Sequence, residues 1–160
     1  MSHYKRILFI CNDNTCRSIM AEAIMKSIEN SISEENRPRV HSRGLVVLFS
    51  EPINPKAVMI MRRNHLEPAK ETSQQFSEAD CKEGTLYLTM TEREKRMVEE
   101  MVPHLSNLYT LREFVGEVGD INEPYGGTEE DYEIVYEHID LMVKMVAQKI
   151  IRFGEQKEDV

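Results

Sequence analysis

Apolar positions along this chain fall into short continuous runs, separated by longer stretches in which they recur every three or four residues. The run at residues 5–11 is apolar on both faces, which is typical of a buried strand in a parallel sheet. Three later segments are also predicted to be strands: 39–45, 85–90 and 107–111. The stretches between and after them predict helices at 18–30, 55–65, 91–101 and 128–153.

The connections are predicted from proline, glycine and polar residues. Three loops are expected, at 46–55, 67–84 and 116–127. The second of these loops is expected to contain a short helix at 73–78. Residues 154–160 are expected to form a frayed tail. No repeat or linker divides the sequence, so we expect one domain over residues 1–160. Because strands alternate with helices, the class is α/β, and ligands are expected at the carboxyl ends of a parallel sheet.

Composition narrows the class of protein. Hydrophobic residues make up 41% of the chain and charged residues 30%, which is the balance of a soluble globular protein. No apolar run approaches the roughly 20 residues needed to span a bilayer, and the first run is too short for a signal peptide. We therefore expect a cytoplasmic protein without membrane contacts. The net charge of −8 argues against nucleic-acid binding but is compatible with one local anion site.

The chain has three cysteines, Cys11, Cys16 and Cys81. Their odd number, with no signal peptide before them, argues against a disulfide framework and allows a reactive thiol. A zinc site is not expected, because Cys11 and Cys16 have no second cysteine or histidine pair at ligand spacing.

The most informative motif connects the first strand to the first helix, where residues 11–18 are Cys-Asn-Asp-Asn-Thr-Cys-Arg-Ser. A short loop at this place can direct its backbone N–H groups and the dipole of the following helix at a phosphate. Arg17 can hold two phosphate oxygens at once. The same field is expected to stabilise a Cys11 thiolate, since such sites lower a thiol pKa from ~8.5 to about 3.5–7.5. Ser18 can donate a hydrogen bond to that thiolate, and Asn14 can hold the shape of the loop.

This segment resembles the phosphate loop of the low-molecular-weight protein tyrosine phosphatases, which is Cys-x-Gly-Asn-x-Cys-Arg-Ser followed by Pro-Met-Ala-Glu. Here the sequence continues with Ile-Met-Ala-Glu at 19–22. Weaker similarities occur at 42–44, 88–91 and 123–127, so the resemblance covers nearly the whole chain. It implies a three-layer sandwich, with a four-stranded parallel sheet flanked by helices and the phosphate loop after the first strand.

The resemblance also implies a mechanism. Cys11 would attack phosphorus and form a cysteinyl-phosphate, while Arg17 and the loop amides stabilise the equatorial oxygens. Glu123 would protonate the leaving group and then activate water. Tyr125 would line the substrate cleft, and no metal or cofactor would be needed. The residues expected to bind phosphate and shape the loop are Asn12, Asp13, Asn14, Thr15, Cys16 and Ser18.

Two departures from the family pattern bear on catalysis. Glu123 replaces the aspartate of the family, so the acid is one methylene longer, and Asp120 is the other candidate. Asp13 replaces a glycine, which suggests a positive φ and adds a carboxylate that opposes anion binding unless it points outward. The alternative is a weakly active or non-catalytic module that only recognises phosphate.

Thr15 leaves the substrate open between phosphotyrosine and phosphoarginine. Tyrosine phosphatases of this family often carry an aliphatic residue here, whereas its protein arginine phosphatase branch carries threonine. The expected partner is a phosphorylated protein or peptide, and the expected state is a monomer or a weak dimer. Cys16 is expected either to form a reversible disulfide with Cys11, as the resemblance suggests, or to be a packed thiol. An arsenate reductase of the related type would need two further cysteines, and only Cys81 remains.

Overall fold

The centre of the molecule is a parallel sheet, seen in a computed structural model that describes residues 4–158. The strands run in the spatial order β2-β1-β3-β4. Neighbouring strands are paired in parallel throughout this sheet. The predicted α/β class and the four-stranded parallel sheet are therefore confirmed. The strands are β1 (Arg6–Cys11), β2 (Arg39–Gly44), β3 (Thr85–Thr89) and β4 (Leu108–Thr110).

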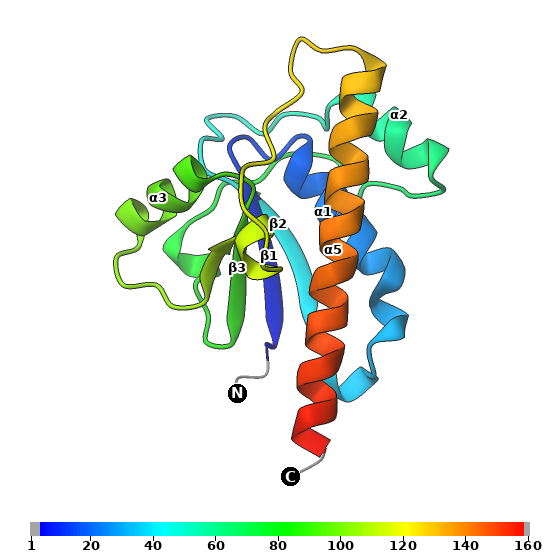
Figure 1. Ribbon diagram of the computed structural model, residues 1–160. Helices are drawn as coiled ribbons and strands as arrows, with labels where there is room; N and C mark the ends of the chain where they lie inside the picture. The colour runs from blue at the N-terminus through cyan, green and yellow to red at the C-terminus, as the bar shows by residue number, and fades with distance from the viewer. Residues whose placement is uncertain (1–3, 159–160) are drawn as a thin grey trace.

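Helices cover both faces of the sheet, with α1 and α5 on one face and α3 on the other (Figure 1). The alternation of side chains along β1 explains this arrangement. Ile7 and Phe9 belong to the larger apolar cluster, which includes residues of α1 and α5. Leu8 and Ile10 pack in a second cluster with Val98 of α3. The helices are α1 (Arg17–Ile28), α2 (Pro55–Arg63), α3 (Glu92–Met101), α4 (Leu111–Phe114) and α5 (Glu129–Glu158).

Three local predictions are wrong. The short helix expected at 73–78 is a 3₁₀ turn at Glu78–Asp80 instead. The strand expected at 107–111 ends at Thr110, whose side chain accepts a hydrogen bond from the Glu113 N–H and so begins α4. The frayed tail expected at 154–160 is helical as far as Glu158, because α5 continues past its predicted end. Residues 159–160 lie outside the described part of the chain.

The topology gathers three segments at one edge of the sheet. The loop after β1, the end of β2 and the segment that follows residue 115 all lie near the carboxyl ends of the strands (Figure 1). Gly44 allows this approach, since a Cβ there would lie 2.8 Å from the carbonyl carbon of Asp13 and 3.0 Å from Asn14 Cβ. The edge where ligands were expected is thus the edge that holds the Cys11 loop. Within residues 4–158, none of the helices is both long and apolar enough to span a membrane.

Candidate active site

Cys11 is the last residue of β1, and its buried thiol faces the start of α1. Its Sγ lies 2.9 Å from Ser18 Oγ, so the predicted contact is present, and it accepts the Asn14 N–H at 3.3 Å. Arg17 and Ser18 form the first turn of α1. Backbone N–H groups in a first turn have no partner within the helix, and the positive end of the helix dipole lies there. The sulfur therefore lies beside donors that suit an anion.

Asn14 fixes the shape of the loop. Its Nδ2 donates to Ser18 Oγ at 2.7 Å and to Ser42 Oγ at 3.0 Å, while its Oδ1 accepts the Gln74 N–H at 3.0 Å. Asn14 also adopts the left-handed conformation, with φ = 59°. The positive φ was predicted one residue earlier, at Asp13, and that prediction is wrong. Asparagine tolerates this conformation better than most residues, so the strain is small.

A buried polar network continues behind Asn14. Ser42 Oγ donates to Glu22 Oε1 at 2.6 Å, and Lys70 Nζ donates to the Ser42 carbonyl at 2.7 Å. Burial lowers the pKa of Lys70 to about 8, although Glu22 opposes this change. Neither Glu22 nor Lys70 was predicted to belong to this network. The sequence does indicate that Glu22 is buried, because Glu22 falls on the buried side of α1 among apolar residues.

Arg17 is the most heavily contacted side chain of the loop, and it is only 2% exposed. Its Nη1 donates to the Ile121 carbonyl at 2.8 Å and to Glu94 Oε1 at 3.2 Å. Its Nη2 donates to Glu94 Oε2 at 2.6 Å and to Glu123 Oε1 at 2.8 Å. Among the described residues, Arg17 Nε has no hydrogen-bond partner. One N–H of a buried guanidinium is therefore left over.

Glu94 was not found from the sequence. It lies on α3, is buried, and also accepts the Met90 N–H at 3.2 Å. The spacing of Glu94 could have indicated its buried position, because Glu94 precedes the buried Val98 by one helical turn. A carboxylate on the inward face of a helix needs a partner, and that partner is Arg17.

These carboxylates change the electrostatics of the thiol. Burial raises the pKa of Cys11 above its ordinary value, Arg17 and Ser18 lower it, and Glu94 raises it again. The net direction is upward, so the predicted lowering of this pKa is wrong. The prediction relied on the field of the helix start and of Arg17, whereas burial of the thiol is the largest influence on its pKa and the carboxylate of Glu94 adds to it.

The segment at 116–127 brings Glu123 and Tyr125 over the loop. The Glu123 side chain is 27% exposed. Burial raises the pKa of Glu123, Arg17 lowers it, and Asp13 raises it, with a net increase. Asp120, the other candidate acid, instead accepts the Glu92 N–H at the start of α3 at 2.9 Å. The structure thus brings Glu123 to Arg17, whereas Asp120 caps the first turn of α3.

Tyr125 links this segment to Asp13 and Thr15. Its hydroxyl donates to Asp13 Oδ2, so its oxygen accepts from the Thr15 hydroxyl, whose Oγ1 lies 2.6 Å away. Asp13 Oδ1 also accepts the Thr15 N–H at 3.2 Å. Burial and Asp13 raise the pKa of Tyr125, which keeps the phenol protonated as a donor. Both carboxylate oxygens of Asp13 therefore accept hydrogen bonds from the protein itself, at the rim of the site.

The remaining candidates surround this centre. The Asn12 carbonyl accepts the Val46 N–H at 2.8 Å, and Cys16 is buried, with a pKa that burial and Cys11 raise. Cys81 lies elsewhere, against the apolar cluster of the α3 face. Among the described residues, no three histidine, cysteine or acidic side chains are grouped to hold a metal ion.

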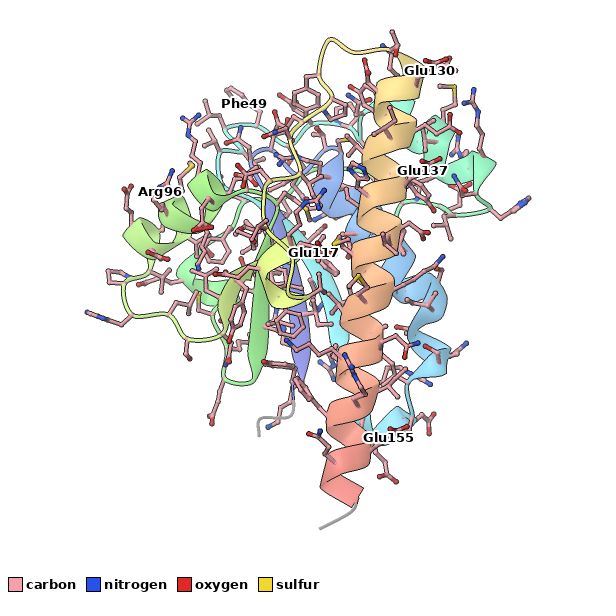
Figure 2. The ribbon with its side chains drawn as sticks, in the orientation of Figure 1. Phe49, Arg96, Glu117, Glu130, Glu137 and Glu155 are labelled. Atoms are coloured by element: carbon pink, nitrogen blue, oxygen red, sulfur yellow. The ribbon has the colours of Figure 1, made fainter. Side chains whose placement is uncertain are left out.

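The rim beside Asp13 carries exposed apolar side chains. Leu48 and Phe49 are 84% and 82% exposed, and with Asp13 they line a hollow of about 170 Å³. Figure 2 shows Phe49 at the outer edge of the molecule, at the end where the Cys11 loop lies.

Residues 6–156 match a family model described as low molecular weight phosphotyrosine protein phosphatase. The protein-tyrosine-phosphatase PtpB of Staphylococcus aureus is 36% identical over 142 residues, which cover 88% of this chain and 96% of that protein. The structure of the YwlE arginine phosphatase from Geobacillus stearothermophilus matches with a TM-score of 0.83 and 31% identity, over 96% of each chain.

A second structure of a YwlE arginine phosphatase is also similar. It has a TM-score of 0.82 and 28% identity, over 91% of this chain and 95% of that chain. In that structure the active-site cysteine is replaced by a serine, and the serine is phosphorylated. The matches thus include both a tyrosine phosphatase and arginine phosphatases.

Replacing Glu94 by glutamine is expected to lower the pKa of the Cys11 thiol, because the negative charge of Glu94 raises it. Glutamine preserves the size of the side chain and leaves the charge of Arg17 less compensated. The measurement is the pH dependence of iodoacetamide alkylation at Cys11, read by mass spectrometry of its peptide. Glu92→Gln, an exposed change on the same helix, is the matched control. An unchanged or higher Cys11 pKa in Glu94→Gln would contradict this account.

Proposed function

The chain belongs to the low-molecular-weight phosphotyrosine protein phosphatase family, and we propose that it hydrolyses phosphorylated protein side chains through a phosphate ester on Cys11. Members of the family are hydrolases that act on phosphomonoesters. The residue roles below are part of the proposal. The phosphorylated serine in the cysteine-to-serine structure of YwlE supports a covalent step at this position of the fold.

One observation carries the proposal: the unpartnered Nε–H of Arg17, buried beside the Cys11 thiol. Leaving a buried donor unsatisfied costs about 1–3 kcal/mol, and more for a charged group, so this position calls for an acceptor. A phosphoryl group supplies oxygens of the right charge. If one oxygen displaces Glu123 from Nη2, Arg17 presents Nε and Nη2 side by side, the fork that binds phosphate in a bidentate manner. Glu94 keeps one N–H of Nη1 and the other N–H of Nη2, across the end of the guanidinium.

The first chemical step forms a sulfur–phosphorus bond. The Cys11 thiol passes its proton to an oxygen of the bound phosphoryl dianion, and the resulting thiolate attacks phosphorus. The bond to the leaving oxygen or nitrogen breaks, and Glu123 gives that atom its proton. Ser18, at 2.9 Å from Sγ, stabilises the thiolate as it forms. Arg17 and the N–H groups at the start of α1 stabilise the negative charge on the three equatorial oxygens.

The second step releases phosphate. Water attacks phosphorus, the sulfur–phosphorus bond breaks, and the Glu123 carboxylate accepts the proton of the water. A raised pKa suits Glu123 for both roles, because a general acid works best when its pKa approaches the working pH. The extra methylene of glutamate is accommodated here, since the carboxylate already reaches Arg17 Nη2 at 2.8 Å.

We propose phosphotyrosine as the principal substrate class and phosphoarginine as the second candidate. The family description and the exposed apolar rim at Leu48 and Phe49 favour an aromatic phosphoester in a peptide. A different observation favours phosphoarginine, namely the carboxylate of Asp13 and the hydroxyl of Thr15 at the rim. A guanidinium group offers several N–H donors that such acceptors can bind.

Replacing Cys11 by serine is expected to reduce hydrolysis of 4-nitrophenyl phosphate by more than about 10³-fold, because a serine hydroxyl is not ionised at neutral pH. Initial rates measured at 405 nm test this. Cys81→Ser is the control and retains the wild-type rate, since Cys81 lies away from the loop. Equal rates for Cys11→Ser and wild type would leave only a phosphate-binding module.

Replacing Glu123 by glutamine is expected to slow the hydrolysis of a phosphoester with a poor leaving group by about 10²–10⁴-fold, with a smaller loss for a good one. The acid form of Glu123 donates the proton, so the wild-type rate falls as pH rises through the raised pKa. That alkaline limb is lost in the variant. The pH profiles of kcat/KM measure both effects. Asp120→Asn is the matched control, and a larger loss there would reassign the acid.

The substrate class is tested by comparing kcat/KM for phosphotyrosine and phosphoarginine peptides of the same sequence, in wild type and two variants. Thr15→Ile and Tyr125→Phe both remove the hydrogen bond between these side chains. If Thr15 acts on the substrate directly, only Thr15→Ile changes the ratio between the two peptides. A ratio that neither variant changes would remove the specificity role of Thr15, and a preference of wild type for phosphoarginine would overturn the principal assignment.

A further inference from the structure

The outer face of α5 carries apolar side chains that have no cover. Ile134 is 51% exposed and Leu141 is 56% exposed, although both belong to a long helix whose opposite face is buried. They are seven residues apart, and Met145, half-buried, follows one turn later. Such spacing places apolar side chains along one line of a helix, as at the seam of a paired helix. In Figure 1 α5 stands at the front of the molecule, and no other helix or strand of the described residues crosses in front of it.

Charged side chains flank this apolar line, and their sign differs between the first and the second half of α5. The exposed side chains before residue 138 include Glu130, Glu133 and Glu137. Figure 2 labels the first and last of these along the upper half of the helix. The exposed side chains after residue 143 include Lys144, whose Nζ donates to Asp140 Oδ2 at 2.9 Å, together with Arg152 and Glu155. The helix surface is therefore strongly acidic toward its start, and its positive charges lie in its second half.

A groove beside the basic half gives the surface its shape. It has a volume of about 520 Å³ and is lined by Val115 from the end of α4 and by Leu141, Met145 and Gln148 from α5. Lys144 and Arg152 also line it. Its floor is thus apolar and its edge is positively charged, which suits an apolar side chain flanked by carboxylates.

We propose that the partner of this face is a second copy of the same chain, whose α5 lies antiparallel to the first. A two-fold axis that crosses the helix between Ile139 and Asp140 places Ile134 of each copy opposite Met145 of the other, in the groove. Leu141 then lies opposite His138. Glu137 of one copy lies two residues along the helix from the position opposite Lys144 of the other, within reach of that long side chain.

The two ends of the contact also match. With the same axis, Glu130 and Glu133 lie opposite the basic end of the partner helix, near Arg152. Each ion pair occurs twice, because a two-fold contact repeats every interaction. The run from 130 to 149 is symmetric about this axis and makes a contact about 30 Å long at 1.5 Å per residue. A reversed copy of the same helix supplies both the apolar line and the complementary charges, so the occupant is a second copy rather than an unrelated protein.

Sedimentation velocity of the full chain over a concentration series tests the proposal. The expected result is a reversible shift from the 18.6 kDa chain to twice that mass. Leu141→Asp abolishes the shift, because it buries a carboxylate in the seam. Met101→Asp, a change of another exposed apolar residue at the end of α3, leaves it unchanged.

A charge exchange identifies the register. Glu137→Lys and Lys144→Glu each bring like charges together and weaken the dimer roughly tenfold, whereas the double variant restores it. Hydrolysis of 4-nitrophenyl phosphate verifies that every variant is folded, since none of these residues belongs to the site. A chain that stays monomeric at all concentrations overturns the proposal. A dimer that survives Leu141→Asp, or single charge variants that the double variant does not rescue, overturns it as well.

Discussion

The buried charge of Arg17 is the constraint on which the rest of the site depends. A guanidinium that is 2% exposed must be compensated, because an uncompensated buried charge costs several kcal/mol. The compensation comes from Glu94 on α3, and from the Ile121 carbonyl and Glu123 in the segment at 116–127. One side chain thereby connects the Cys11 loop to two other parts of the fold. Through Glu94, the placement of α3 therefore bears on the proposed phosphate site.

The two segments that form the mouth of the site are tied at two points of different character. Arg17 and Glu123 form an ion pair that a phosphoryl group can replace, because its oxygens compete for the same nitrogen. Tyr125, Asp13 and Thr15 form hydrogen bonds at the rim that a phosphoryl group on Arg17 does not need to break. The second contact can therefore hold the acid segment in place while the first exchanges its anion. The carboxylate of Asp13, which seemed opposed to anion binding in the sequence, has a structural partner.

The parts of the fold set by local pattern could be predicted, and those set by long-range contacts could not. The strands β1 and β3 followed from their apolar runs, and the Cys11–Arg17 spacing located the loop. Glu94 was missed because its importance depends on Arg17, which is distant in sequence. Asp13 and Asn14 both tolerate a positive φ, so only the packing against Ser42 and Gln74 selects Asn14. Gly154 suggested the end of α5, but it allows a close approach to Asn36 and lies within the helix.

In the proposed mechanism, the charges around Glu123 link substrate binding to the protonation of this general acid. Arg17 lowers the pKa of Glu123, while burial and Asp13 raise it. A phosphoryl group that takes over Nη2 removes the lowering influence and adds negative charge nearby, so both changes favour protonation of Glu123. The proton taken up on binding is then the proton that the leaving group requires. Because linkage is reciprocal, protonation of Glu123 must also strengthen phosphate binding at Arg17. The glutamate that occupies the anion site at rest thus becomes the acid when the substrate displaces it.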